Sequence, residues 1–121
     1  MILNLTDTHF DRENLLQVKQ IFVQAKNICL ANDISLVVHN GDWFTNRTGQ
    51  SLSTLIAMLE VLEDFNEAGI KIMTIPGNHD KTNQENQESY LDVFSNHPSL
   101  TLYKKESVTN LSAGFSLSFL P

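Results

Sequence analysis

Apolar and polar positions follow one another along the chain in blocks that predict short buried strands separated by amphipathic helices. Ile2 to Leu5 is a short β-like run, and the stretches Ile34 to His39 and Ile70 to Ile75 are longer, apolar and rich in β-branched residues. Between them, apolar residues recur at spacings of three and four, the period of a helix with one buried face. The series strand–helix–strand–helix–strand predicts a parallel sheet, buried on both faces, with right-handed crossovers and helices packed around it.

Each helical stretch has an expected inner face and expected ends. In the first, the inner face comprises Leu15, Val18, Phe22, Ala25 and Cys29, widened by Ile21 and Ile28. We expect Asp11 to cap this helix, which should end near Asn32. In the second, the inner face comprises Leu52, Leu55, Ile56, Leu59 and Leu62. Ser51 or Ser53 is expected to cap this second helix, and Gly69 to end it.

Beyond Asp80 the pattern is weaker. Lys81 to Glu88 is polar and predicts a loop, and Ser89 to Phe94 predicts a short helix. Leu100 to Tyr103 and Phe115 to Leu120 are typical of further strands. With no repeat or linker in the sequence, we expect one α/β domain.

Length, composition and charge limit the classes of function. The 121 residues suffice for a single domain with a core, and a hydrophobic fraction of 41% argues against disorder. The net charge of −6 argues against binding nucleic acid through bulk electrostatics, so a phosphate-binding role would need metal ions for positive charge. The single Cys29 excludes an internal disulfide, and no apolar run approaches the ~20 residues of a membrane span. We expect a cytoplasmic protein without a membrane segment.

Polar side chains that can bind a metal follow each of the first three predicted strands. Asp7 and His9 follow the first strand, Asp42 follows the second, and Asn78 and His79 follow the third. Any one of these clusters alone is also typical of a turn. In a parallel sheet, however, the three strands end at the same edge, where ligands bind. The three clusters together therefore predict a metal site, with Asp7 and His9 directed to one side by an extended chain. Carboxylate, imidazole and amide ligands suit manganese, iron or zinc better than calcium.

These clusters resemble the first three motifs of the calcineurin-like metallophosphoesterases. The segments concerned are Asp7-Thr8-His9, Gly41-Asp42 and Gly77-Asn78-His79-Asp80, in this order and at this spacing. The resemblance implies a layered α/β sandwich, of which residues 1–121 would be the N-terminal βαβαβ half with further strands after it.

The same resemblance implies a ligand set and two catalytic residues. Asp7, His9 and Asp42 would hold one divalent ion, and Asp42 and Asn78 would hold a second. Mn²⁺ is the expected ion, with Fe²⁺, Zn²⁺ and Mg²⁺ as alternatives. His79 would be the catalytic imidazole, and Asp80 would orient it.

Within the superfamily, the chain is most similar to the SbcD-type exonuclease subunits of recombination and repair. The supporting segments include Gly41-Asp42-Trp43-Phe44 and Ile75-Pro76-Gly77-Asn78-His79-Asp80. The similarity implies hydrolysis of DNA phosphodiesters, exonucleolytic or endonucleolytic, with an SMC-like ATPase as partner and a homodimer as one form of the assembly. A phosphomonoesterase or cyclic-nucleotide phosphodiesterase with the same metal site is an alternative. A non-catalytic remnant that serves as a binding module is another.

Two departures from the family pattern weaken the expected activity. Thr45 stands three residues after Asp42, where many cellular members carry a histidine. Only His97 follows His79, so the family's later Gly-His-x-His motif is missing. We therefore expect a truncated domain that binds at most one metal well and is weak or inactive alone. Trp43 and Phe44 could contact a nucleobase or a neighbouring subunit, but aromatics at this position more often pack under the site.

Overall fold

A computed structural model describes residues 1–82, 88–112 and 115–119 of the 121-residue chain. The first five elements are β1 (Leu3–Leu5), α1 (Leu15–Ala31), β2 (Leu36–His39), α2 (Leu52–Glu67) and β3 (Lys71–Thr74). They are followed by the 3₁₀ helices η1 (Asn78–Asp80) and η2 (Tyr90–Phe94) and the strands β4 (Leu100–Leu102), β5 (Ser107–Ser112) and β6 (Phe115–Phe119). The predicted βαβαβ series is confirmed, while parts of the predicted Lys81 to Glu88 loop and Leu120 lie outside the described residues. Among the described residues, no helix is both long enough and apolar enough to span a membrane.

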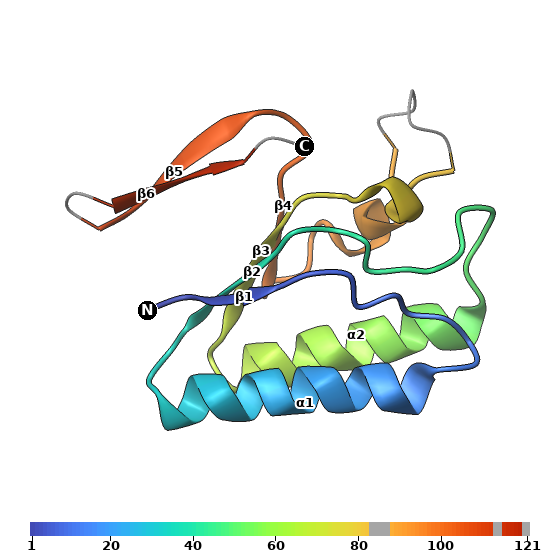
Figure 1. Cartoon of the computed structure of the whole chain (residues 1–121), viewed down its shortest axis with the longest axis horizontal. Helices are drawn as coiled ribbons and strands as arrows, with labels where there is room; N and C mark the ends of the chain where they lie inside the picture. Colours follow the sequence, from blue (N-terminus) through green and yellow to red (C-terminus); the bar gives the residue numbers. More distant parts are fainter. Residues whose placement is uncertain (83–87, 113–114, 120–121) are drawn as a thin grey trace.

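A four-stranded sheet, with order β1-β2-β3-β4 and every pair parallel, forms the centre of the fold. Leu5 pairs with His39, and His39 pairs with Thr74, so the carboxyl ends of the first three strands are level. The loops that follow β1, β2 and β3 therefore emerge at the same edge of the sheet, on the right in Figure 1. This register is what brings the three polar clusters together.

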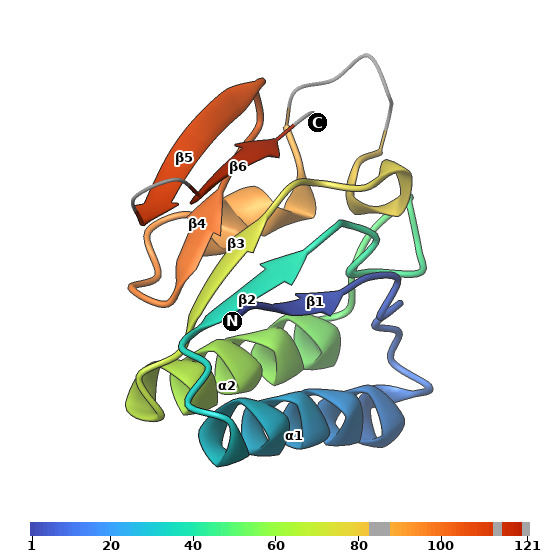
Figure 2. The ribbon, with the colours of Figure 1, turned by 60° about the vertical axis from the view of Figure 1, so that its left-hand side comes forward.

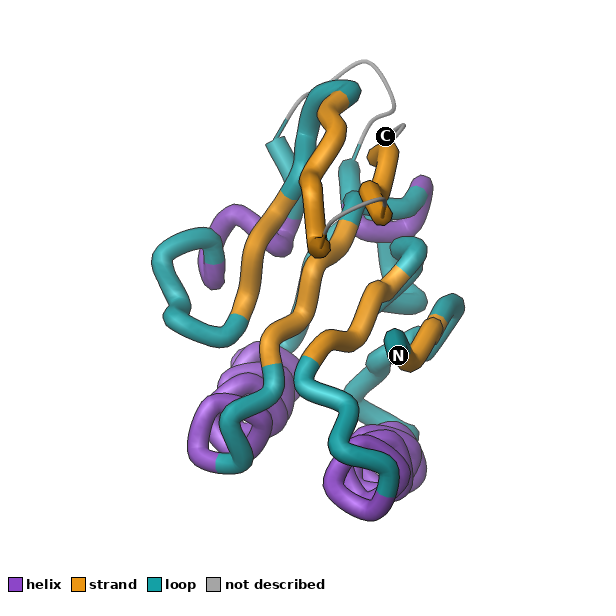
Figure 3. The backbone as a smooth tube through the Cα atoms, turned by 90° about the vertical axis from the view of Figure 1, so that its left-hand side faces the viewer, coloured by secondary structure: helices purple, strands orange, loops and turns teal. Residues whose placement is uncertain are grey.

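The helices cover only one face of the sheet, which corrects the prediction of helices packed around it. Figure 3 shows α1 and α2 side by side beneath the four strands. Because the strand order follows the chain order, crossovers of one hand place both helices on the same side. On the other face, Asn4 and Thr101 are exposed.

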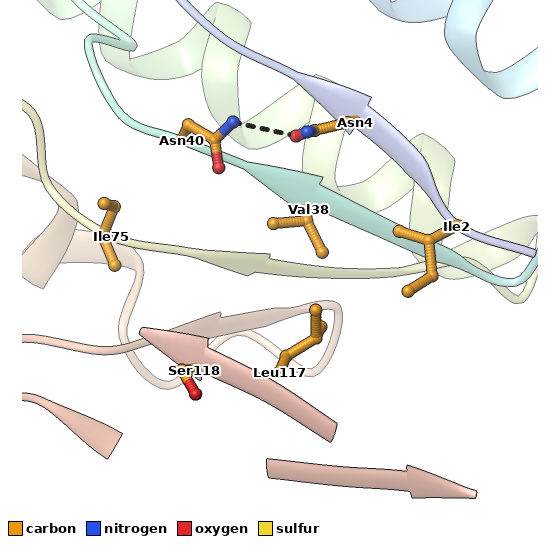
Figure 4. A pocket seen from close by; sticks show the side chains of 7 residues that line it. All are labelled: Ile2, Asn4, Val38, Asn40, Ile75, Leu117 and Ser118. Atoms are coloured by element: carbon orange, nitrogen blue, oxygen red, sulfur yellow. Dashed lines mark hydrogen bonds between the residues drawn. The ribbon is translucent and has the colours of Figure 1, made fainter. Parts of the chain in front are cut away.

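The antiparallel hairpin of β5 and β6 lies over this second face. Between hairpin and sheet is a pocket of about 400 Å³, lined on the sheet side by Val38 and Ile75 and on the hairpin side by Leu117 (Figure 4). A hydrogen bond of 3.0 Å from Asn40 Nδ2, just after β2, to Asn4 Oδ1 in β1 lies in the same region. The fold is thus layered, with helices, sheet and hairpin in that order.

Helix α1 packs largely as predicted. Its buried residues are Val18, Phe22, Ala25 and Cys29. Ile21 and Ile28, however, are 43% and 47% exposed, so the predicted widening of the inner face is wrong. The cap is also different from the one expected, because Asn14 rather than Asp11 occupies the N-cap position.

Helix α2 begins as predicted but is rotated relative to the predicted inner face. Ser51 is the N-cap, and its hydroxyl accepts a hydrogen bond from Thr54 N. The buried residues are Thr54, Ala57, Met58, Val61, Leu62 and Phe65. Of the predicted face, only Leu62 is fully buried, whereas Leu52 is 73% exposed.

The rotation of α2 follows from its contacts with α1. Lys26 Nζ lies 2.8 Å from Asp64 Oδ2, and Lys19 pairs with Glu60 one turn earlier. Phe65 packs edge-on against Phe22, with 6.0 Å between ring centroids. Since apolar residues occur on most sides of α2, these tertiary contacts decide which side is buried.

Candidate metal centre

Three side chains that can bind a metal converge beyond the carboxyl edge of the sheet. They lie on the loops that follow β1 and β2, whose course Figure 2 shows. Asp7, His9 and Asp42 each offer a nitrogen or oxygen atom, and these atoms all lie within 4.8 Å of one another. His9 Nε2 is 3.5 Å from Asp7 Oδ1. Two carboxylates and an imidazole this close together can share one cation.

The first two loops are aligned because the pairing of β1 with β2 continues past the strand ends. Asp7 N donates to Gly41 O at 3.1 Å, and His9 N donates to Asp42 O at 3.1 Å. Farther along, Phe10 and Phe44 form a parallel bridge. Backbone hydrogen bonds thus hold the ligands of one loop beside the ligand of the other.

The backbone conformation of the three ligand residues is unusual. The φ angles are 54° at Asp7, 52° at His9 and 56° at Asp42. Among the described non-glycine residues, only Asp33 joins them in the positive-φ region. The two side chains do lie on one side, as predicted. The predicted cause, an extended chain, is wrong, because both residues have a left-handed backbone conformation. Such strained residues gather at functional sites.

The third loop packs directly against Asp42. A Cβ atom on Gly77 would lie 2.2 Å from both the backbone N and Oδ1 of Asp42, so only glycine fits there. Next along the chain, His79 N donates a hydrogen bond of 2.9 Å to Asp42 Oδ1. Asn78 lies between these two contacts, at the start of η1, and its side chain is exposed.

The ring of His79 is held by the second loop. Its Nδ1 lies 2.9 Å from Thr45 O, and because a carbonyl oxygen only accepts, Nδ1 carries the hydrogen. The ring also meets His9 edge-on, with 5.5 Å between centroids. Thr45 in turn donates its hydroxyl hydrogen to His9 O at 2.9 Å. Thr45, which departs from the family pattern, thus links all three loops.

Asp80 is fully buried and binds backbone amides. Its Oδ1 accepts from Phe44 N at 3.0 Å, and its Oδ2 accepts from Gly77 N at 2.8 Å. Burial raises the pKa of this carboxyl to about 6, against the opposing effect of the two amides. The hydrogen bonds of Asp80 therefore join the second and third loops, while Thr45 holds the His79 ring.

His39 is a structural feature of the site that sequence reasoning missed. It is fully buried, and its ring nitrogens contact Thr8 Oγ1 and Gly41 N, both at 3.1 Å. Burial lowers the pKa of this imidazole to about 3. The alternation of strand residues could have indicated it, because His39 is two positions after the buried Val37 and so faces the same side.

The aromatic residues after Asp42 support the site from below. Trp43 and Phe44 are both fully buried, so the packing interpretation is right and direct contact with a nucleobase is excluded in this structure. Trp43 Nε1 donates to Thr74 Oγ1 at 2.9 Å. His97 contacts Ser99 just before β4 begins, at the opposite edge of the parallel sheet from the metal ligands.

Comparison with known proteins identifies a matching family and similar proteins. The model of the family Calcineurin-like phosphoesterase matches residues 1–120. The DNA double-strand break repair protein Mre11 of Saccharolobus solfataricus is 26% identical in an alignment of 85 residues that covers 65% of this chain and 22% of that protein. The crystal structure of the nuclease MPE of Pseudomonas putida superposes with a TM-score of 0.54 at 17% identity, over 84% of this chain and 46% of that one. The nuclease supports the fold alone, and the chain spans less than half the length of either protein.

Proposed function

The chain belongs to the calcineurin-like phosphoesterase family, and from that premise we propose that it carries the metal-holding part of a hydrolase that cleaves phosphodiester bonds in DNA. The observation that carries the proposal is the convergence of Asp7, His9 and Asp42, whose ligand atoms lie within 4.8 Å of one another. Phosphoester hydrolysis is the activity of the family. The more specific part of the proposal is that the substrate is DNA.

The donor set suits the metals expected from the sequence. Carboxylate and imidazole ligands together favour Mn²⁺, Fe²⁺ or Zn²⁺, and we propose Mn²⁺. The left-handed φ angles at all three ligand residues add support, because such conformations gather at functional sites. When bound, divalent ions at this position supply Lewis-acid activation of the phosphate and of the attacking water.

In this proposal each motif has its own role. Asp7 and His9 hold the first ion, and Asp42 contributes to both ions because its loop lies between the other two. Asn78 would provide the amide ligand of the second ion. His79 offers its Nε2 to the substrate, since Nδ1 is engaged by Thr45 O. A protonated ring could there stabilise a phosphate oxygen or protonate the leaving oxygen.

The second ion should be held more weakly than the first. Of the remaining histidines among the described residues, His39 is buried beneath the ligands and His97 lies at the opposite sheet edge. Asp42 and Asn78 would therefore hold this ion without an imidazole from the described part of the chain. We accordingly propose one tight site and low activity for the chain alone, as the N-terminal part of a complete nuclease domain.

DNA is favoured over other phosphoesters by the similarity of this chain to a DNA double-strand break repair protein. The resemblance to SbcD-type subunits extends the proposal to recombination or repair in the cytoplasm. There the partner would be an SMC-like ATPase and the assembly a homodimer.

Metal binding can be tested with two matched variants. Asp42→Asn and Asp33→Asn make the same chemical change at two aspartates with positive φ, but Asp33 lies in the turn after α1. We expect calorimetry to find one tight Mn²⁺ site in the wild type and in Asp33→Asn, and a large loss of affinity in Asp42→Asn. Equal affinities in the three proteins, or two tight sites in the wild type, would contradict the proposed ligand set.

The substrate can be tested by comparing three phosphoesters in Mn²⁺. Linear duplex DNA, p-nitrophenyl phosphate and a cyclic nucleotide represent the nuclease, phosphomonoesterase and cyclic-nucleotide phosphodiesterase functions. We expect slow digestion of the DNA, abolished in Asp42→Asn. Turnover of only one of the small substrates would replace the nuclease proposal. No turnover of any phosphodiester, even by a longer form that carries the family's later Gly-His-x-His motif, would favour a non-catalytic binding module.

A further inference from the structure

A buried imidazole joins the two loops that carry the proposed ligands of the first ion. Thr8, whose hydroxyl contacts His39 Nε2, lies between Asp7 and His9 in the chain. Gly41, whose amide contacts His39 Nδ1, immediately precedes Asp42. The His39 side chain is therefore bonded to residues that are direct chain neighbours of Asp7, His9 and Asp42.

The geometry selects one protonation form of this imidazole. The Gly41 amide only donates, so Nδ1 of His39 must be the unprotonated nitrogen. The neutral ring then carries its hydrogen on Nε2 and donates it to Thr8 Oγ1. The Thr8 hydroxyl is left with its own hydrogen, which can reach Trp43 O at 3.5 Å. Every polar atom in this series has a partner of the right kind.

The ring has little freedom to turn. His39 stacks on Trp43 with 4.0 Å between centroids and 16° between planes, and Phe22 lies parallel on the same stack. Both His39 and Trp43 are fully buried. A stacked, buried ring with both nitrogens bonded is a rigid connection, because any rotation would leave a buried polar atom without a partner.

We propose that His39 is a positioning residue of the metal centre, which fixes the spacing of the loop of Asp7 and His9 from the loop of Asp42. The inference rests on the proposed function, since it concerns the site assigned there. Second-layer partners of metal ligands typically change metal affinity about 10-fold to 100-fold when removed. His39 acts one step farther out, through the backbone of both loops.

Two substitutions separate the hydrogen bonds from the packing. His39→Phe retains a flat ring against Trp43 but removes both bonds. Ser99→Ala is the matched control, because it removes a buried hydrogen bond, from Ser99 Oγ to Leu62 O at 2.9 Å, away from the ligands. We expect His39→Phe to weaken Mn²⁺ binding about 10-fold in calorimetry, and Ser99→Ala to leave it unchanged.

Partial replacements provide a rescue test. The amide of His39→Gln can reach the position of Nε2 and donate to Thr8, while the amide oxygen of His39→Asn can reach the position of Nδ1 and accept from Gly41. Both should retain more Mn²⁺ affinity than His39→Phe. Thr8→Val should weaken binding on its own, and adding it to His39→Phe should cause a smaller further loss than it causes in the wild type.

A readout independent of the metal completes the test. In the chelator-treated protein, nitrogen NMR of the imidazole should report His39 as the neutral form with hydrogen on Nε2. Mn²⁺ binding by the wild type with unchanged affinity in His39→Phe, or an equal loss in Ser99→Ala, would overturn the positioning role and leave the proposed function intact. Absence of Mn²⁺ binding by the wild type would instead remove the proposed function, and the positioning role with it.

Discussion

The backbone amide of His79 donates a hydrogen bond of 2.9 Å to Oδ1 of Asp42. This contact orients the carboxylate of the second loop from the third loop. His79, which carries the proposed catalytic imidazole, thus also holds the carboxylate of Asp42, the proposed shared ligand, through its backbone. A change that separates these two loops should therefore lower the metal affinity more than it lowers the stability of the fold.

Substitution of Gly77 tests that dependence most directly. A Cβ atom at this position would meet the backbone N and Oδ1 of Asp42 at 2.2 Å, a distance that forces the loops apart. We expect Gly77→Ala to weaken Mn²⁺ binding at least about 10-fold, an effect comparable to loss of an outer-layer partner. Gly49→Ala is the control, because nothing lies within 4 Å of the Cβ position there. Similar calorimetric affinities for the two variants would contradict the close packing of these loops.

Mn²⁺ should stabilise the folded protein through its ligands. A ligand at about 100 times its dissociation constant adds about 2.7 kcal/mol to the free energy of unfolding if it binds only the folded state. We expect the melting temperature of the wild type to rise on addition of Mn²⁺ and to fall back on addition of a chelator. Asp7→Asn should lose most of that rise and Asp33→Asn should retain it. A rise in all three would place the ion elsewhere.

The rotation of α2 can be tested by stability measurements. Met58 is fully buried, so Met58→Ala should lower the free energy of unfolding by about 2–5 kcal/mol. Leu52 is 73% exposed, and Leu52→Ala should change it by less than about 0.5 kcal/mol. Urea unfolding of the two variants gives both values. The reverse ranking would support the face that the sequence pattern predicted.

Two buried groups should give the stability opposite dependences on pH. The pKa of Asp80 is raised to about 6, so the protonated acid favours the fold, and this contribution is lost as the pH rises from 3.8 to 6. The pKa of His39 is lowered to about 3, so the neutral ring favours the fold, and this contribution is lost as the pH falls from 6.5 to 3. Each slope is about 1.4 kcal/mol per pH unit, so the two nearly cancel between pH 4 and 6.

A substitution that removes one of the two groups should therefore leave the pH dependence of the unfolding free energy that the other group causes. Relative to the wild type, the unfolding free energy of His39→Phe should fall by about 2 kcal/mol as the pH rises from 4 to 6. That of Asp80→Asn should rise by a similar amount over the same range. Denaturant unfolding in chelator measures both differences, and common contributions from exposed carboxylates cancel. Parallel profiles for the three proteins would show that neither group is buried in the charge state described.

The sequence alone determined the series of elements and the positions of the three polar clusters. The apolar blocks around Val37 and Ile72 are too short for helices, and each ends in residues that break a strand. These are local properties, and the parallel arrangement follows from them because sequential strands joined by helices pair in this way. The convergence of Asp7, His9 and Asp42 followed from the arrangement without any knowledge of side-chain contacts.

Tertiary structure alone decided which side of α2 is buried, how the ligand residues meet and what lies beneath them. Leu52 and Met58 are both apolar in a helical pattern, but the packing of α2 in the core buries Met58 fully and leaves Leu52 73% exposed. The left-handed turns at Asp7 and Asp42 depend on backbone bonds between loops far apart in sequence. The role of His39 depends on two partners, Thr8 and Gly41, that only the folded sheet brings to its two nitrogens. Long-range hydrogen bonds of this kind have no local signature, because no periodicity in the chain records them.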